Sequence, residues 1–120
     1  MIEIILYTLL LYFLQLFLPV TLKRKMTDEM FQRSRRASEN LKESLPAFLA
    51  LAILSIFLDV QTNTVAASYW LFLRVIFAAI YISGFNLKPA NDSGHQAQPL
   101  RSFVWALSIV ALFDMAFNFI

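Results

Sequence analysis

Four long, largely apolar segments occupy most of this chain and leave no room for a separate soluble domain. As helical spans they cover residues 2–22, 34–60, 64–87 and 101–120. A helix needs about 20 apolar residues to cross the roughly 30 Å hydrocarbon core of a bilayer. Because the chain has only 120 residues, 59% of them hydrophobic, four spans use most of it. The sequence therefore predicts an all-α membrane protein with one domain, residues 1–120, built as an up-down bundle of four transmembrane helices.

The basic residues are concentrated in one predicted connection between spans. Of the 10 Lys and Arg residues, the following lie there or just beyond it: Lys23, Arg24, Lys25, Arg33, Arg35, Arg36 and Lys42. Basic loops favour the cytoplasmic side of a membrane, so we expect the loops at 23–33 and 88–100 in the cytoplasm and both termini outside. This pattern indicates an integral, multi-pass protein, most simply of a bacterial inner membrane. Its basic residues are expected to contact membrane lipids and not nucleic acid.

Several kinds of catalytic site are disfavoured by what the sequence lacks. The chain has no Cys, which excludes disulfides and thiolate catalysis by the protein itself. It has no Gly-rich phosphate loop and no HExxH motif. Its single His, His95, lies among turn-forming residues without a set of metal ligands, so no metal site is expected. No predicted span is interrupted by paired Gly and Pro, which disfavours a small transporter.

A polar stripe enters the second predicted span at its cytoplasmic end. At about 100° per residue, Arg36, Asn40 and Glu43 fall on one helical face. The apolar stretch between Glu43 and Asp59 measures only about 23 Å as a helix, so the span has to extend back through Asn40. Polar groups at that depth need partners. Asn40 and Glu43 are therefore candidate site residues, whereas topology explains most of the arginines before them, with Arg36 kept as a candidate.

Arg74 lies near the middle of the third predicted span, which is otherwise uncharged. An Arg at the centre of a span costs about 3 kcal/mol on insertion scales, so its side chain is expected to face protein. The sequence leaves two explanations open. Arg74 either binds an anion, or it is structural and pairs with a carboxylate or with Trp70 four residues earlier. Asp59 and Asp114 lie toward the outer side, and the sequence assigns them no partner.

Three elements, taken in order, resemble one known family. The segment from Asn40 to Phe48 has the pattern N-x-x-E-x-x-P-x-F, Arg74 and Tyr81 follow on the third span, and Arg101 opens the fourth. Together they resemble the MAPEG superfamily, the membrane-associated proteins of eicosanoid and glutathione metabolism, and most closely its small bacterial members. The resemblance covers all four spans.

This resemblance implies a left-handed four-helix bundle that assembles as a homotrimer, with glutathione between neighbouring subunits near the cytoplasmic side. In characterised members, glutathione is held by Arg, Asn and Glu of the second helix, Arg and Tyr of the third, and Arg at the start of the fourth. The matching positions here are Arg36, Asn40, Glu43, Arg74, Tyr81 and Arg101. Arg101 is the candidate catalytic residue, because a nearby guanidinium favours the thiolate form of a thiol.

The resemblance suggests a glutathione-dependent transferase or peroxidase acting on a lipophilic electrophile, a small molecule that the membrane concentrates. The alternative is a non-catalytic membrane scaffold or accessory protein that keeps the fold without glutathione chemistry, since a fold does not imply a function. Glu39 stands where some enzymes of the family carry a further Arg, Phe77 where some have His, and Trp105 where some have Tyr. The stretch between Tyr81 and Arg101 is also longer than usual.

Overall fold

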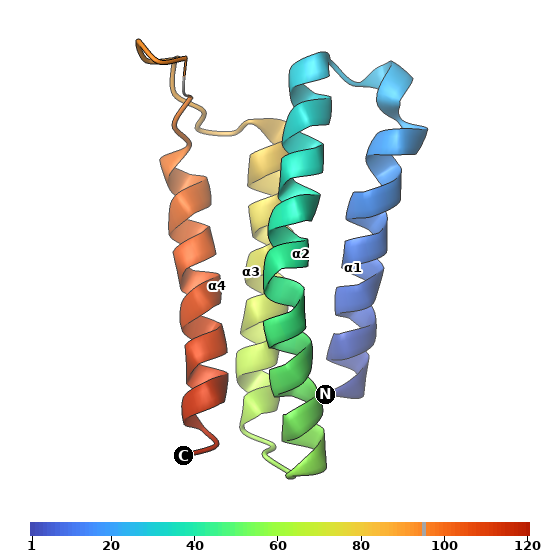
Figure 1. Ribbon diagram of the computed structural model, residues 1–120, viewed down its shortest axis with the longest axis vertical. Coiled ribbons are helices and arrows are strands. Elements are labelled where there is room, and N and C mark those ends of the chain that lie inside the picture. Colours follow the sequence, from blue (N-terminus) through green and yellow to red (C-terminus); the bar gives the residue numbers. More distant parts are fainter. Residues whose placement is uncertain (95) are drawn as a thin grey trace.

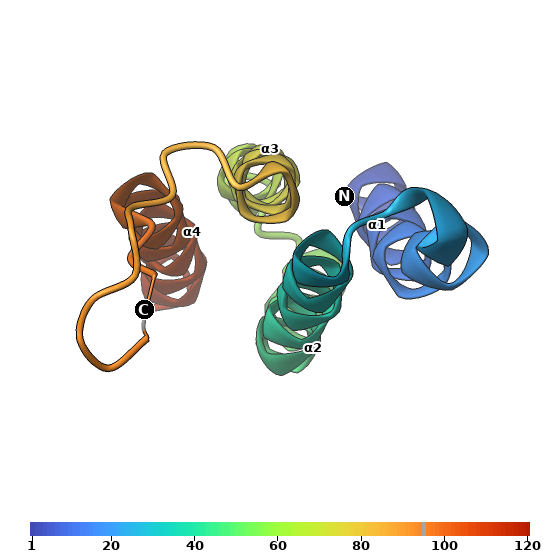
Figure 2. The ribbon, with the colours of Figure 1, turned by 90° about the horizontal axis from the view of Figure 1, so that it is seen from above.

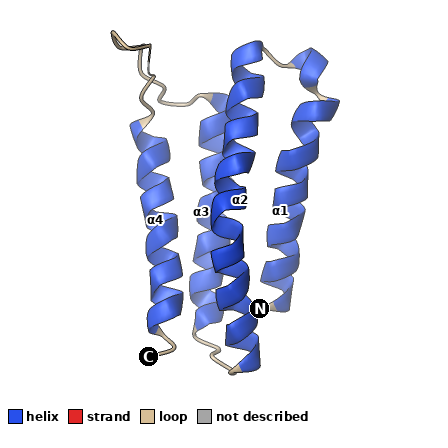
Figure 3. Cartoon of the chain, in the orientation of Figure 1, coloured by secondary structure: helices blue, strands red, loops and turns tan. Residues whose placement is uncertain are grey.

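A computed structural model describes residues 1–94 and 96–120 of the chain, and it shows four antiparallel helices (Figure 1). In chain order these are α1 (Ile2–Thr21), the short 3₁₀ turn η1 (Lys23–Lys25), α2 (Asp28–Phe57), α3 (Asn63–Ser83) and α4 (Pro99–Phe117). The described residues contain no strand (Figure 3). All four helices are long and apolar enough to cross a membrane. The predicted all-α, four-helix membrane fold is therefore confirmed.

α2 is one continuous helix, so the charged run enters the apolar segment without a break. Thr27 caps its start, because its Oγ1 accepts a hydrogen bond from the N–H of Met30 at 3.1 Å. Asp28 and Glu29 lie in the first turn, where negative charge is favourable. The helix has 30 residues and is therefore about 45 Å long, which exceeds the roughly 30 Å hydrocarbon core. Part of α2 must extend beyond the membrane interior.

Glycine and proline set the neighbouring ends of α3 and α4. α3 stops at Ser83, before the end of the predicted span at 64–87, because Gly84 adopts a φ of 75° and ends the helix in the left-handed conformation. α4 begins with Pro99, slightly before the predicted span at 101–120. Proline suits a first helical position, because the N–H that it lacks would have no partner within the helix.

The helices form a shallow array with α2 and α3 at its centre (Figure 2). α1 packs against α2, and α4 packs against α3. The molecule measures 48 × 31 × 17 Å, and both termini lie at the same end (Figure 1). We call this the terminal end. The opposite end carries Lys23–Lys25 and the α3–α4 connection, and we call it the basic end.

The core combines stacked aromatic rings with small side chains. Phe48 of α2 and Trp70 of α3 stack with their ring centroids 4.0 Å apart and their planes 7° from parallel. Ala52 and Ala67, both fully buried, allow the helices to approach closely. Large apolar side chains such as Phe72, by contrast, are exposed on the outside. This distribution suits a bundle surrounded by lipid.

A buried polar network ties three helices together at the terminal end. Asn63 at the start of α3 donates through Nδ2 to the Ser55 hydroxyl at 2.8 Å and to the Met115 carbonyl at 3.1 Å. Asn118 in turn donates to Asn63 Oδ1 at 2.7 Å. These bonds join α2, α3 and α4 at the terminal end.

Candidate functional site

Arg74 is buried between α2 and α3 and is held by an amide, not by a carboxylate. Its side chain is 1% exposed, and its Nη2 donates to Asn40 Oδ1 at 2.8 Å. Its guanidinium carbon lies 4.4 Å from the centre of the Phe77 ring. Trp70, which the sequence offered as a stacking partner, packs on Phe48 instead. No carboxylate among the described residues forms an ion pair with Arg74.

Two donors of Arg74 have no acceptor within the described part of the chain. Its Nε and Nη1 are buried and make no hydrogen bond there. Leaving a buried donor unpaired costs about 1–3 kcal/mol, and more when the group is charged. Arg74 is therefore only partly satisfied by Asn40, and a further acceptor at this position would be favourable.

Two aromatic rings of α3 lie between two guanidinium groups, one from α3 and one from α4. Phe77 lies against Arg74, and the Phe77 and Tyr81 rings meet edge to face with centroids 5.6 Å apart. The guanidinium of Arg101, from the first turn of α4, lies 4.4 Å from the centre of the Tyr81 ring. This column carries cationic groups from the middle of α3 to the basic end.

Two cavities meet at this column. The first, which we call the deep chamber, has a volume of about 390 Å³ and is lined by Asn40, Phe77, Tyr81, Arg101, Ser102, Trp105 and Ala106. The second, which we call the rim chamber, also has a volume of about 390 Å³ and is lined by Arg33, Arg36, Tyr81, Leu87, Ser93, Gly94, Gln96 and Arg101. Tyr81 and Arg101 line both, so they stand at the boundary between the two chambers.

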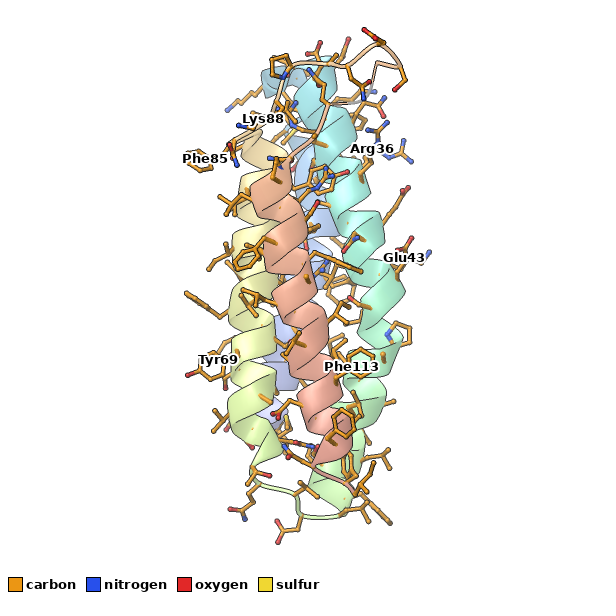
Figure 4. All side chains as sticks on the ribbon, turned by 90° about the vertical axis from the view of Figure 1, so that its left-hand side faces the viewer. Arg36, Glu43, Tyr69, Phe85, Lys88 and Phe113 are labelled. Atoms are coloured by element: carbon orange, nitrogen blue, oxygen red, sulfur yellow. The ribbon has the colours of Figure 1, made fainter. Side chains whose placement is uncertain are left out.

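The fold brings most of the residues named from the sequence into this region. Asn40, Tyr81 and Arg101 line the deep chamber, and Arg74 reaches it through its bond to Asn40. Arg36 lines the rim chamber. Glu43 lies apart from them, because it is exposed on α2 and lines neither chamber (Figure 4).

Two residues of this region were not singled out from the sequence. Arg33 lines the rim chamber, although the charge pattern of a cytoplasmic connection already accounts for an Arg at this position. Gln98 is 1% exposed and donates through Nε2 to the carbonyls of Ile80 at 2.7 Å and Phe85 at 2.8 Å. It fastens the start of α4 to the end of α3. A single Gln beside a loop proline carries no sequence signal for such a role.

The described residues contain no group of three or more His, Asp or Glu side chains that could hold a metal ion. His95, the one His of the chain, lies outside the described residues. The chemistry that this region offers is therefore that of guanidinium, amide and hydroxyl groups, which bind anions.

The four spanning helices and the buried arginine site define the chain as an integral, multi-pass membrane protein with a polar pocket inside its helical bundle. The MAPEG family model matches residues 4–120, essentially the whole chain, and the protein belongs to that family. It is thus a member of a family of glutathione and eicosanoid metabolism. No curated protein and no solved structure shows a significant match to it.

Proposed function

We propose that this protein is a glutathione-dependent transferase or peroxidase that acts on lipophilic electrophiles. Arg74 carries the proposal, because its buried guanidinium bonds Asn40 and keeps two donors without an acceptor in the described part of the chain. A buried cation with free donors favours an anionic ligand. Membership of the MAPEG family makes glutathione the ligand to test first.

The side chains around the two chambers suit the charged groups of glutathione, which has two carboxylates, an ammonium group and a thiol. Arg74 and Asn40 would hold one carboxylate, since a guanidinium can bind a carboxylate through two parallel hydrogen bonds. Arg36 would hold the other from the rim chamber. Tyr81 would add its hydroxyl between them. Glu43 lines neither chamber of its own chain, so it would reach the ammonium group of glutathione from a neighbouring subunit of the proposed trimer.

Bound glutathione would supply a thiol as the nucleophile. Arg101 would lie beside the sulfur and stabilise its negative charge, which favours thiolate over thiol. The Tyr81 ring supports this role by holding the Arg101 guanidinium at 4.4 Å. Trp105 is 41% exposed on α4, so a lipophilic electrophile would reach the deep chamber past it from the bilayer.

A homotrimer with glutathione between subunits is part of the proposal. The α2 surface that carries Lys42 and Glu43 is exposed in the single chain (Figure 4). A charged side chain facing the hydrocarbon centre costs about 2.5 kcal/mol or more, so another copy of the chain is a better neighbour for this surface than lipid. Native mass spectrometry of detergent-released protein is expected to show trimers, and a uniform monomer would contradict the assembly.

Calorimetric titration with glutathione tests the binding step. Wild-type protein in detergent is expected to bind saturably, and Arg74→Gln should weaken binding by about tenfold or more, since hydrogen bonds to charged groups contribute about 1.5–3 kcal/mol. Arg24→Gln is the matched control, because Arg24 is exposed in η1 and lines neither chamber. The absence of saturable binding by the wild type would sink the proposal.

Turnover separates the two catalytic activities. A transferase would conjugate glutathione to chlorodinitrobenzene, whereas a peroxidase would reduce cumene hydroperoxide. Arg101→Gln should lower the rate of either reaction more than it weakens glutathione binding, because its proposed role is to stabilise the thiolate. Equal losses of rate and binding would assign Arg101 to binding alone.

A non-catalytic scaffold is the second candidate function. Arg74 already has an amide acceptor in Asn40 and an aromatic neighbour in Phe77, and these contacts favour a structural role. A stable trimer that binds no glutathione would support this alternative.

A further inference from the structure

The side chain of Gln98 is buried at the junction of α3 and α4, although glutamine lies mostly at protein surfaces. It is 1% exposed, and the residue occupies the N-cap position of α4. Its Nε2 donates to the Ile80 carbonyl at 2.7 Å and to the Phe85 carbonyl at 2.8 Å. One amide group therefore joins the start of α4 to the backbone on both sides of Gly84, where α3 ends.

The bonds of Gln98 lie next to the contact between Arg101 and Tyr81. Arg101 follows Gln98 within about one helical turn, and the Ser102 N–H donates to the Gln98 carbonyl at 3.2 Å. On the other helix, Tyr81 directly follows Ile80. The Arg101 guanidinium lies 4.4 Å from the centre of the Tyr81 ring. The same amide therefore holds the backbone beside both members of this pair.

A second side chain, Arg33 of α2, holds the same end of α3. Its Nε donates to the Ile82 carbonyl at 3.3 Å, and its guanidinium lies so close to Gly84 that a Cβ there would be 3.2 Å from Nη2. The last carbonyls of a helix have no partner within it, and the carboxyl end of a helix favours a cation. Arg33 thus fixes the end of α3 to α2, and Gln98 fixes α4 to that end.

The length of the α3–α4 connection makes such an anchor important. A longer connection has more conformations to lose when its two ends are brought together. The Lys88 N–H donates to the Ala97 carbonyl at 2.7 Å, and this bond joins the two arms of the connection to each other. The bonds of Gln98, by contrast, join its far end to α3.

Stability alone does not account for a glutamine at this position. The Gln98 Oε1 is buried and has no hydrogen-bond partner among the described residues. Leaving a buried acceptor unpaired costs as much free energy as a typical hydrogen bond contributes, or more. The unpaired oxygen therefore offsets part of what the two Nε2 bonds contribute, and an apolar side chain of similar length would avoid that cost. What an apolar side chain would lose is the fixed position of α4.

We propose that Gln98 is a positioning residue that holds Arg101 over Tyr81, so that the Arg101 guanidinium stands beside the thiol of bound glutathione. This inference rests on the proposed function, in which Arg101 stabilises the thiolate. The stabilisation of a charge depends on the distance to its partner and is largest for groups that are in place before the charge forms. Without the anchor, Arg101 would stay nearby but unfixed, and more of the bound glutathione would remain thiol.

Calorimetric titration of the full chain in detergent with glutathione, at a series of pH values, tests this role. Gln98→Met removes both donors and keeps the length of the side chain. At a pH low enough to keep the bound ligand as thiol, it should bind glutathione as tightly as the wild type does. As the pH rises and the wild type binds the thiolate, the affinity of Gln98→Met should fall behind by up to about tenfold. No loss at any pH would overturn the proposal, and so would an equal loss at every pH, which would assign Gln98 to the fold or to binding in general.

Gln32→Met is the matched control, because it makes the same chemical change at another glutamine. Gln32 is exposed on α2 and lines neither chamber, so its substitution should leave the wild-type pH profile. The same altered profile in both variants would contradict a specific role of Gln98.

The position of α4 can also be measured without glutathione, which separates this inference from the proposed function. The chain has no cysteine, so spin labels can be attached at Ala79→Cys on α3 and Phe103→Cys on α4, both exposed positions. Labelled chains are diluted with unlabelled ones, so that electron spin resonance measures distances within one chain. The distance distribution should be narrow in the wild-type background and broader with Gln98→Met. An equally narrow distribution would overturn the proposal.

Gln98→Glu is a second variant in case Gln98→Met does not fold. It keeps the shape and polarity of the side chain but has no N–H donor, so it too should broaden the distance distribution. A wild-type distribution in a folded Gln98→Glu protein would overturn the proposal. If the wild type binds no glutathione, the proposed function fails, and the distance measurement still decides whether Gln98 holds α4.

Discussion

Removing the Asn40 side chain should destabilise the bundle more than its size suggests. Asn40 is the one hydrogen-bond acceptor that Arg74 has among the described residues. In the Asn40→Ala variant, a guanidinium that is 1% exposed would keep no acceptor at all. Because a hydrogen bond to a charged group contributes about 1.5–3 kcal/mol, we expect the free energy of unfolding to fall by about that amount.

The same substitution should cost little once the buried charge is gone. Arg74→Met keeps a long side chain and removes the charge, and replacing a buried ionic group by an apolar one of similar volume is often neutral or stabilising. In the Arg74→Met protein, Asn40→Ala removes only a neutral amide and should cost less than about 1 kcal/mol. The coupling between the two positions is therefore expected to be about 1–2 kcal/mol, well above the error of additivity for independent sites.

The four proteins of this double-mutant cycle would be unfolded by titration with SDS in mixed micelles and followed by circular dichroism. Ser44→Ala supplies the matched control, because Ser44 lies one turn along α2 and bonds only the Leu41 carbonyl in the described chain. It should have the same small effect with and without Arg74. An equal cost of Asn40→Ala in the two backgrounds would refute the assignment of Asn40 as the partner that satisfies Arg74.

Three further outcomes are expected. Gly84→Ala should lower the free energy of unfolding by about 1 kcal/mol or more in the same SDS titration, since its φ of 75° disfavours a side chain. Phe48→Ala should lower it by about 3–5 kcal/mol, because a fully buried ring stacked on Trp70 is lost; a cost near zero would contradict the described core. The chain has no cysteine of its own, so single introduced cysteines can report the orientation in the membrane. Ala90→Cys should react with an impermeant maleimide only from the cytoplasmic side, and Thr62→Cys only from outside. The reverse pattern would refute the predicted orientation.

The fold was predictable because the apolar segments alone nearly fill the chain. Their lengths predicted four spans, and the continuity of the charged run with the second span predicted a helix over 34–60, whereas α2 covers Asp28–Phe57 and takes up part of the predicted loop at 23–33. The helix ends were less predictable. Gly84 and Pro99 are recognisable signals, but either also fits a flexible loop, so the exact end of α3 depends on backbone geometry that composition does not carry.

The contacts of Arg74 show where prediction from sequence stopped. Its depth in the third span required it to face protein, and Asn40 was named independently from the second span. Their bond joins residues 34 positions apart, so it depends on how α2 is rotated against α3. Phe48 of α2 stacks on Trp70 of α3 across the same helix pair, and this contact occupies the ring that the sequence offered as a partner for Arg74.

The position of Arg101 illustrates a different limit. The spacing of Arg74, Phe77 and Tyr81 places them along one helical face, but Arg101 follows a long connection whose course the sequence leaves open. In the structure, Gln98 holds the far end of this connection. Its Nε2 donates hydrogen bonds to the Ile80 and Phe85 carbonyls and so fixes the start of α4 beside the end of α3. The connection is long, but Gln98 still holds the start of α4 at that position. The length of the loop is therefore no argument against Arg101, which lies over the Tyr81 ring at 4.4 Å.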